Sequence, residues 1–198
     1  MESAARRSEP VFGRGGPVSP LPFEGGQVGQ RRFRDAMGLF PTGVTLLTTR
    51  APDGVDHGMT ANSVTSVSLD PLLVLVCVEH ASRVHGALLA SGLWAISVLP
   101  TDAEALSRRL ARRGHSTAEA LAAVPHHRGA RTGALVLDSA LSAIECRTWA
   151  AHPGGDHTVV IGEVLSIATP RPDLPPLAWH RGRYTGVAPA IEAIPPVG

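Results

Sequence analysis

The sequence predicts a mainly β fold with inserted helices, in which the strands close into a barrel. Many short apolar or alternating segments are separated by turns rich in Gly, Pro and Asp. The most informative stretch is residues 58–78, where an alternating strand leads through the turn Asp70-Pro71 into an apolar strand. Only eight aromatic residues occur in the 198-residue chain, so Val, Leu, Ala and Ile must fill the core.

The first half of the domain is expected to hold one helix and three strands. Phe33, Met37 and Phe40 fall at helical spacing, so we expect a helix over residues 30–40 that Pro41 ends. β-Branched and apolar runs bounded by turn residues predict strands over residues 44–49, 57–68 and 72–79.

The second half is expected to alternate helices with longer strands. Helices are predicted over residues 82–90, 102–113 and 117–124; the Arg-rich face of the second is read as a solvated surface. A polar loop should follow the third helix. Strands are predicted over residues 93–99, 140–150, 158–168 and 177–184, with residues 152–157 as the connection of a long hairpin.

Composition places one folded domain between two flexible tails. Residues 1–29 and 188–198 are rich in Gly and Pro, so we expect residues 30–187 to form the domain. No apolar segment predicts a signal peptide or a membrane span. Cys77 and Cys146 each lie in an apolar strand pattern, which indicates buried thiols in a reduced, cytoplasmic protein.

The charge pattern excludes several function classes. Eighteen basic and 17 acidic residues give a net charge of +1, and no basic stripe is interleaved with aromatics, so nucleic acid is a poor partner. All the basic residues are Arg, which excludes a Schiff-base lysine and a P-loop lysine. The pair His126-His127 has no third ligand at suitable spacing, so a zinc site is not expected.

Two short segments have the chemistry of a binding site. Thr60-Ala61-Asn62-Ser63 offers small hydrogen-bonding groups that suit the polar edge of a flat ring such as a flavin, although an ordinary strand edge would look the same. Ser82 and Arg83 begin a helix, where free N–H groups and the helix dipole can bind a phosphate; a plain N-cap is the alternative.

Two further segments contain candidate ligand-facing side chains. His157 follows Gly154 and Gly155, where the backbone can approach a ligand closely, and a neutral imidazole can contact a nicotinamide; an exposed hairpin histidine is the alternative. Arg183 and Tyr184 end the last predicted strand and could contact a nucleotide or simply form a surface.

The order of these motifs resembles the flavin reductase family, which has the FMN-binding split β-barrel fold. The resemblance covers about residues 30–187. Members are the small reductase components of two-component flavin-dependent monooxygenases. The matching motifs, in order, are Phe40-Pro41-Thr42-Gly43-Val44, Thr60 to Pro71, Cys77-Val78-Glu79 with Ser82, Gly155-Asp156-His157 with Ile161-Gly162-Glu163-Val164, and Arg181-Gly182-Arg183-Tyr184.

The resemblance implies a homodimeric reductase that transfers a hydride from NADH or NADPH to FMN or FAD. The resemblance further implies that reduced flavin passes to a separate monooxygenase; from composition and charge, neither nucleic acid nor a membrane is expected as a partner. It implies that His157 faces the nicotinamide as the catalytic residue. The cofactor-binding positions it implies are Thr42, Thr60, Ala61, Asn62, Ser63, Cys77, Val78, Glu79, Ser82, Arg83, Arg183 and Tyr184.

One segment departs from the family pattern. A basic–aromatic pair usually follows the Arg-rich helix, whereas residues 114–119 of this chain contain neither an aromatic nor a cationic Lys or Arg residue. Loss of this pair weakens flavin binding, which suits a reductase that releases flavin as a substrate and equally a decayed enzyme. Independently of this segment, two alternatives to the reductase remain: a non-catalytic flavin-binding split-barrel protein, and an oxidoreductase that keeps its flavin tightly bound and reduces another acceptor.

Overall fold

The computed structural model describes residues 28–112 and 116–187. Its helices are α1 (Gln30–Met37), α2 (Arg83–Ser91), α3 (Glu104–Leu110) and α4 (Thr117–Leu121), with a 3₁₀ turn at Thr101–Ala103. The strands are β1 (Thr42–Gly43), β2 (Thr45–Arg50), β3 (Asp56–Ala61), β4 (Thr65–Leu69), β5 (Leu72–Glu79), β6 (Leu93–Val98), β7 (His126–Arg128), β8 (Leu135–Leu137), β9 (Ala143–Gly154), β10 (His157–Ala168), β11 (Leu177–His180) and β12 (Arg183–Gly186).

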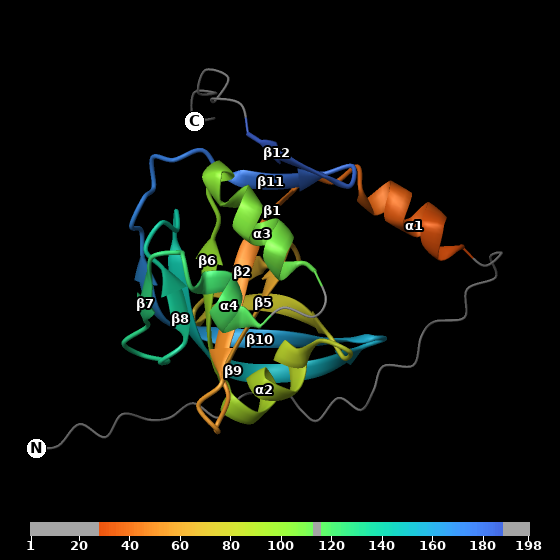
Figure 1. Cartoon of the computed structure of the whole chain (residues 1–198). Coiled ribbons are helices and arrows are strands. Elements are labelled where there is room, and N and C mark those ends of the chain that lie inside the picture. The colour runs from red at the N-terminus through yellow and green to blue at the C-terminus, as the bar shows by residue number, and fades with distance from the viewer. Residues whose placement is uncertain (1–27, 113–115, 188–198) are drawn as a thin grey trace, which may run out of the picture.

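A seven-stranded antiparallel sheet, in the order β3-β2-β6-β9-β10-β5-β4, forms the body of the molecule. Strands β1, β11 and β12 make a second sheet, and β7 pairs with β8. Helix α1 projects away from the body beside the β11–β12 hairpin, whereas α3 and α4 lie against the large sheet (Figure 1). The predicted mainly β fold with inserted helices is confirmed.

Alternate residues of the central strands face two hydrophobic cores. In β2, Leu46 belongs to one cluster and Leu47 to the other; in β6, Ala95 and Trp94 divide in the same way. Successive strand residues point to opposite faces, so strands covered on both faces read as nearly continuous apolar runs. Helices α3 and α4 cover the first core, and α2 covers the second.

The large sheet curls but does not close, so the predicted closed barrel is wrong and the split form is observed. Its two edge strands, β3 and β4, are consecutive in sequence, and only residues 62–64 connect them. Four residue steps reach at most about 14 Å, so Ala61 and Thr65 hold the two edges close together at one end. The polar loop predicted to bind a ligand lies at this split.

Three sequence-based assignments are corrected by the backbone. Residues 57–68 form two strands rather than one, because β3 and β4 pair with different partners. The predicted loop after α4 contains the β7–β8 hairpin. The connection between β9 and β10 is only Gly155-Asp156, and Gly155 has φ +75°, since a two-residue hairpin turn needs left-handed backbone.

The last strand is also a hairpin. Residues 177–184 were expected to form one strand, but Arg181 and Gly182, with φ of +51° and +73°, turn the chain between β11 and β12. Positive φ at both central residues defines a type I′ turn, which joins antiparallel strands tightly. The Arg181 N–H donates to Gly38 O at 2.7 Å, which links this hairpin to the end of α1.

A bidentate ion pair joins the β7–β8 hairpin to the large sheet and predicts a pH effect. Arg128 donates to both carboxylate oxygens of Asp56 at 2.9 and 2.8 Å. This hydrogen bonding is the main cause that lowers the pKa of Asp56. A carboxyl with a lowered folded-state pKa stabilises the fold above its unfolded pKa, and this contribution is lost as pH falls through the folded value.

We therefore expect Asp56→Asn to lower the free energy of unfolding by about 1 kcal/mol at neutral pH. The difference from the unmodified protein should shrink below about pH 4, where the unfolded carboxyl becomes protonated. Urea denaturation of both proteins at a series of pH values measures this. A difference that is independent of pH would contradict the assignment.

Candidate functional site

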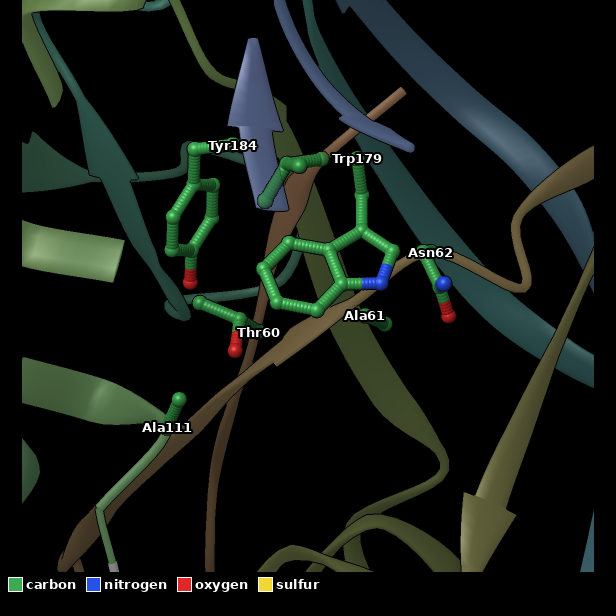
Figure 2. A pocket seen from close by; sticks show the side chains of 7 residues that line it. Thr60, Ala61, Asn62, Ala111, Trp179 and Tyr184 are labelled. Atoms are coloured by element: carbon green, nitrogen blue, oxygen red, sulfur yellow. The ribbon is translucent and has the colours of Figure 1, made fainter. Parts of the chain in front are cut away.

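A pocket of about 170 Å³ opens beside the split of the sheet. Four separate parts of the chain form its walls: the residue between β1 and β2, the end of β3 with the loop after it, the residue after α3, and the β11–β12 hairpin. In Figure 2 the indole of Trp179 lies between Tyr184 and Asn62. The lining residues are Val44, Thr60, Ala61, Asn62, Ala111, Trp179 and Tyr184.

The aromatic wall of this pocket is held in place by α3. The rings of Trp179 and Tyr184 meet edge to face, with centroids 4.8 Å apart. The Tyr184 hydroxyl and the Oγ of buried Ser107 lie 2.9 Å apart in a hydrogen bond. The Arg108 guanidinium lies 4.7 Å from the Tyr184 ring centroid, a cation–π distance, while Arg108 also pairs with Glu104. Tyr184 is therefore oriented by groups that do not need a ligand.

The polar loop after β3 is fixed to β5. Ser63 Oγ donates to Cys77 O at 3.2 Å and accepts from Cys77 N–H at 3.0 Å. On the other side, the Ser82 hydroxyl caps α2 by accepting from Val84 N–H and contacts Met59 Sδ at 3.6 Å. The end of β3, the end of β5 and the start of α2 therefore lie together.

His157 begins β10 at the same edge, opposite Glu79 of β5. Its Nδ1 lies 2.7 Å from Asp156 Oδ1, and this hydrogen bond is the main cause that lowers the pKa of the Asp156 carboxyl. An ionised carboxylate only accepts, so Nδ1 carries the proton. In the neutral ring, Nε2 is then a free acceptor on a side chain that is 40% exposed. This geometry suits an amide N–H of a ligand.

Two more histidines, His80 and His85, contact the residue that follows His157. His85 Nε2 lies 2.8 Å and His80 Nε2 3.2 Å from the hydroxyl of buried Thr158, the residue after His157. Thr158 has one hydroxyl proton, so at least one of the two imidazoles must donate to the oxygen. The backbone N–H of His80 also donates to the backbone carbonyl of Asp156. The start of β10 is therefore held by side chains as well as by its strand partners.

The structure divides the predicted site residues into two groups. Thr60, Ala61, Asn62 and Tyr184 line the pocket. A second group lies next to it in the sheet: Ser63 in the loop after β3, Cys77, Val78 and Glu79 at the end of β5, Ser82 and Arg83 at the start of α2, and His157 at the start of β10.

Three predicted residues need comment. Val78 is fully buried in the second core, so only its backbone is available to a ligand. Arg183 is exposed at the start of β12 and does not line the pocket. Thr42, in β1, is the cross-strand partner of Trp179 and does not itself line the pocket.

Sequence reasoning missed Val44, Ala111 and Trp179 as pocket residues. Trp179 was hidden because residues 177–184 were read as one strand, which places Trp179 and Tyr184 far apart. In the observed hairpin they are direct cross-strand partners. An Arg-Gly turn signal between two aromatics could have indicated this pairing.

The residues present fit a flat, polar-edged ring. The pocket combines an aromatic wall with the Thr60 hydroxyl and the Asn62 amide. Beside it, the Thr42 hydroxyl oxygen is buried without a hydrogen-bond partner among the described residues, so a polar group remains available there. Within the same described ranges, no group of three or more His, Cys, Asp or Glu residues could hold a metal ion.

The segment that departs from the family pattern begins another helix. Gly114 and His115 lie outside the described residues, and Ser116 with Glu119 forms the capping box of α4. A cation and an aromatic ring do meet near the pocket, but Arg108 and Tyr184 supply them from α3 and β12.

Comparison with known proteins assigns the fold and the motifs to one family. The family described as "Flavin reductase like domain" matches residues 37–188. The chain belongs to the flavin reductase family. "Flavin reductase (NADH)" of Kitasatospora aureofaciens is 40% identical over 167 residues, which cover 83% of this chain and 85% of that protein.

Two other family members add to this comparison. The "Flavin-dependent monooxygenase, reductase subunit HsaB" of Rhodococcus jostii is 38% identical over 159 residues, covering 80% of this chain and 78% of that protein. The structure of the Streptomyces globisporus NADH:FAD oxidoreductase SgcE6, in complex with NAD and FAD fragments, matches with a TM-score of 0.74 and 35% identity. That match covers 80% of this chain and 93% of SgcE6.

Proposed function

We propose that this chain is an NADH:flavin oxidoreductase that reduces FMN or FAD and supplies the reduced flavin to a separate flavin-dependent monooxygenase. One observation carries the proposal: the polar loop of Thr60 and Asn62 faces an aromatic wall in one pocket, and the same loop is bonded to β5, whose last residue pairs with His157. Family membership and the names of the relatives support the same activity, with NADH as the donor.

Each part of the site has a role in this proposal. A bound flavin supplies two-electron redox chemistry, and the chain's own residues bind and orient the reactants. Thr60, Asn62 and Ser63 hold the polar edge of the flavin ring. The start of α2, with Ser82 and Arg83, holds a phosphate at the helix N-terminus. The free Nε2 of His157 accepts a hydrogen bond from the nicotinamide carboxamide.

Steady-state oxidation of NADH and NADPH, with and without added FMN, FAD and riboflavin, tests the activity. We expect saturable acceleration by free flavin and a preference for NADH. Saturable flavin binding without oxidation of either nucleotide would instead indicate a flavin carrier. Flavin that copurifies, with no response to added flavin, would indicate a reductase of another acceptor.

The loop itself is tested by Asn62→Ala. Removal of one hydrogen-bonding amide costs about 1 kcal/mol, so the dissociation constant for FMN should rise about fivefold while the fold stays intact. Equilibrium dialysis measures binding, and urea denaturation measures stability. Ser66→Ala is the matched control, since Ser66 is exposed on β4 and does not line the pocket. Equal FMN binding by Asn62→Ala and the unmodified protein would show that the Asn62 side chain of this loop does not bind the flavin.

We also infer a homodimer, because α1 has no buried residue although one of its faces is apolar. Phe33 and Met37 of α1, and Phe40 just after it, are 60%, 52% and 65% exposed. A second copy of the chain would cover this surface. Light scattering of the purified protein measures its mass, and Phe33→Glu with Met37→Glu should shift it toward the monomer.

The inferred location is the cytoplasm. Both Cys77 and Cys146 are free, and burial raises the pKa of the Cys146 thiol to about 12, so this thiol is unreactive. Free thiols are typical of reducing compartments. Among the described residues, no helix has the length and hydrophobicity needed to cross a membrane.

A further inference from the structure

The wall of the pocket opposite the polar loop is aromatic, and Trp179 is its largest member. Trp179 lies in β11 and is half-buried, with one side packed against the first core and another lining the pocket. In Figure 2 the broad face of its indole is turned toward the viewer, with Tyr184 and Thr60 on one side and Asn62 on the other. An aromatic ring that lines a pocket offers flat ligands a stacking surface.

The indole is held in position before any ligand arrives. Tyr184 contacts it edge to face, and Tyr184 is itself held by Ser107 and Arg108 of α3. On the other side, Trp179 pairs with Thr42 of β1. A ring fixed by its neighbours loses little conformational freedom when a ligand stacks on it, so more of the contact energy appears as affinity.

We propose that Trp179 is the stacking residue for the isoalloxazine ring and thereby a determinant of flavin affinity. The proposal rests on the proposed function, because it assigns one more residue to the same flavin site. The polar edge of the ring would meet Thr60 and Asn62, and its flat face would lie on the indole. Adenine, which FAD and NADH both contain, is a second flat ring that could stack on the indole, and the experiment separates isoalloxazine from adenine.

Quenching of tryptophan fluorescence by FMN, riboflavin and AMP provides a readout that does not depend on turnover. The chain has three tryptophans: Trp94 is fully buried, Trp149 is half exposed on β9, and Trp179 lines the pocket. We expect saturable quenching by FMN and riboflavin but not by AMP. Trp179→Phe should lose most of this quenching, and Trp149→Phe should retain it.

Affinity is measured independently by equilibrium dialysis with FMN. Loss of a stacking face typically weakens binding of a flat heterocycle about 10-fold, so Trp179→Leu should raise the FMN dissociation constant by about that factor. Trp179→Phe should lie between Trp179→Leu and the unmodified protein because it keeps a smaller ring. This graded series separates stacking from a general loss of structure, which urea denaturation of each variant also checks.

Three results would overturn the assignment. One is an unchanged FMN dissociation constant in Trp179→Leu while the unmodified protein still binds flavin and oxidises NADH; the proposed function would then survive without this residue. Another is quenching by AMP but not by riboflavin, which would show that adenine, and not isoalloxazine, stacks on Trp179. The third is the absence of flavin binding by the unmodified protein, which would remove the proposed function as well.

Discussion

Gly162→Ala is expected to lower the free energy of unfolding by about 3 kcal/mol. Gly162 lies at a register shift between β9 and β10, where the ring of Trp94 crosses the strand. An added Cβ would meet Trp94 Cη2 at 2.8 Å and Cys146 Cβ at 3.0 Å, and would come closer still to Trp94 Cζ2. Trp94 is fully buried and donates to Thr148 Oγ1 at 3.1 Å, so it has little room to move.

Urea denaturation measures the effect, and Gly86→Ala is the control. Gly86 is exposed inside α2 with no neighbour within 4 Å of an added Cβ, so alanine there should stabilise by about 0.5–1 kcal/mol. The double variant Gly162→Ala with Trp94→Phe should lose less free energy of unfolding than the two single variants lose together, because a smaller ring relieves the clash. An unchanged midpoint for Gly162→Ala would show that the sheet accommodates a methyl group there.

His157→Ala should lower kcat/KM for NADH by about 10- to 100-fold, while the FMN dissociation constant changes by less than about twofold. The imidazole is held by Asp156 and leaves Nε2 available as an acceptor at the edge of the site. If that nitrogen orients the nicotinamide carboxamide, its loss misplaces the hydride donor and leaves the flavin pocket intact. Stopped-flow reduction of bound FMN by NADH measures the step directly.

His152→Ala is the matched control for this variant. His152 lies in the same hairpin, on β9 opposite Val159, and is exposed. Its removal should change neither NADH kinetics nor flavin binding. Equal NADH kinetics in His157→Ala and His152→Ala would exclude a nicotinamide-facing role, whereas a loss of FMN binding in His157→Ala would place this residue at the flavin instead.

Local signals predicted most of the secondary structure. Helix α2 is bounded by the Ser82 cap and by Gly92, whose φ of +65° closes the helix, and both residues are recognisable in the sequence. The β7–β8 hairpin was missed because its strands are only three residues long and β7 is entirely polar. Barrel closure could not be derived, since strand alternation fixes which face is buried but not whether edge strands meet.

Site residues that lie in one continuous segment could be predicted from the sequence, whereas those that only strand pairing or packing brings to the pocket could not. Thr60 and Asn62 were identified because small polar residues interrupt a strand pattern. Trp179 depends on the pairing of two strands that the sequence presents as one. The orientation of Tyr184 depends on Ser107, a buried serine in an Arg-rich helix, and no local pattern distinguishes that serine.

The ribosome synthesises the segments that line the pocket at different times. Protein synthesis completes the polar wall at residues 60–62 early, whereas Trp179 and Tyr184 are among the last described residues to leave the ribosome. A nascent chain therefore lacks the aromatic wall until the final hairpin can fold onto α3. We expect fragments that end before β11, whether from early termination or proteolysis, to leave the cell's flavin unbound.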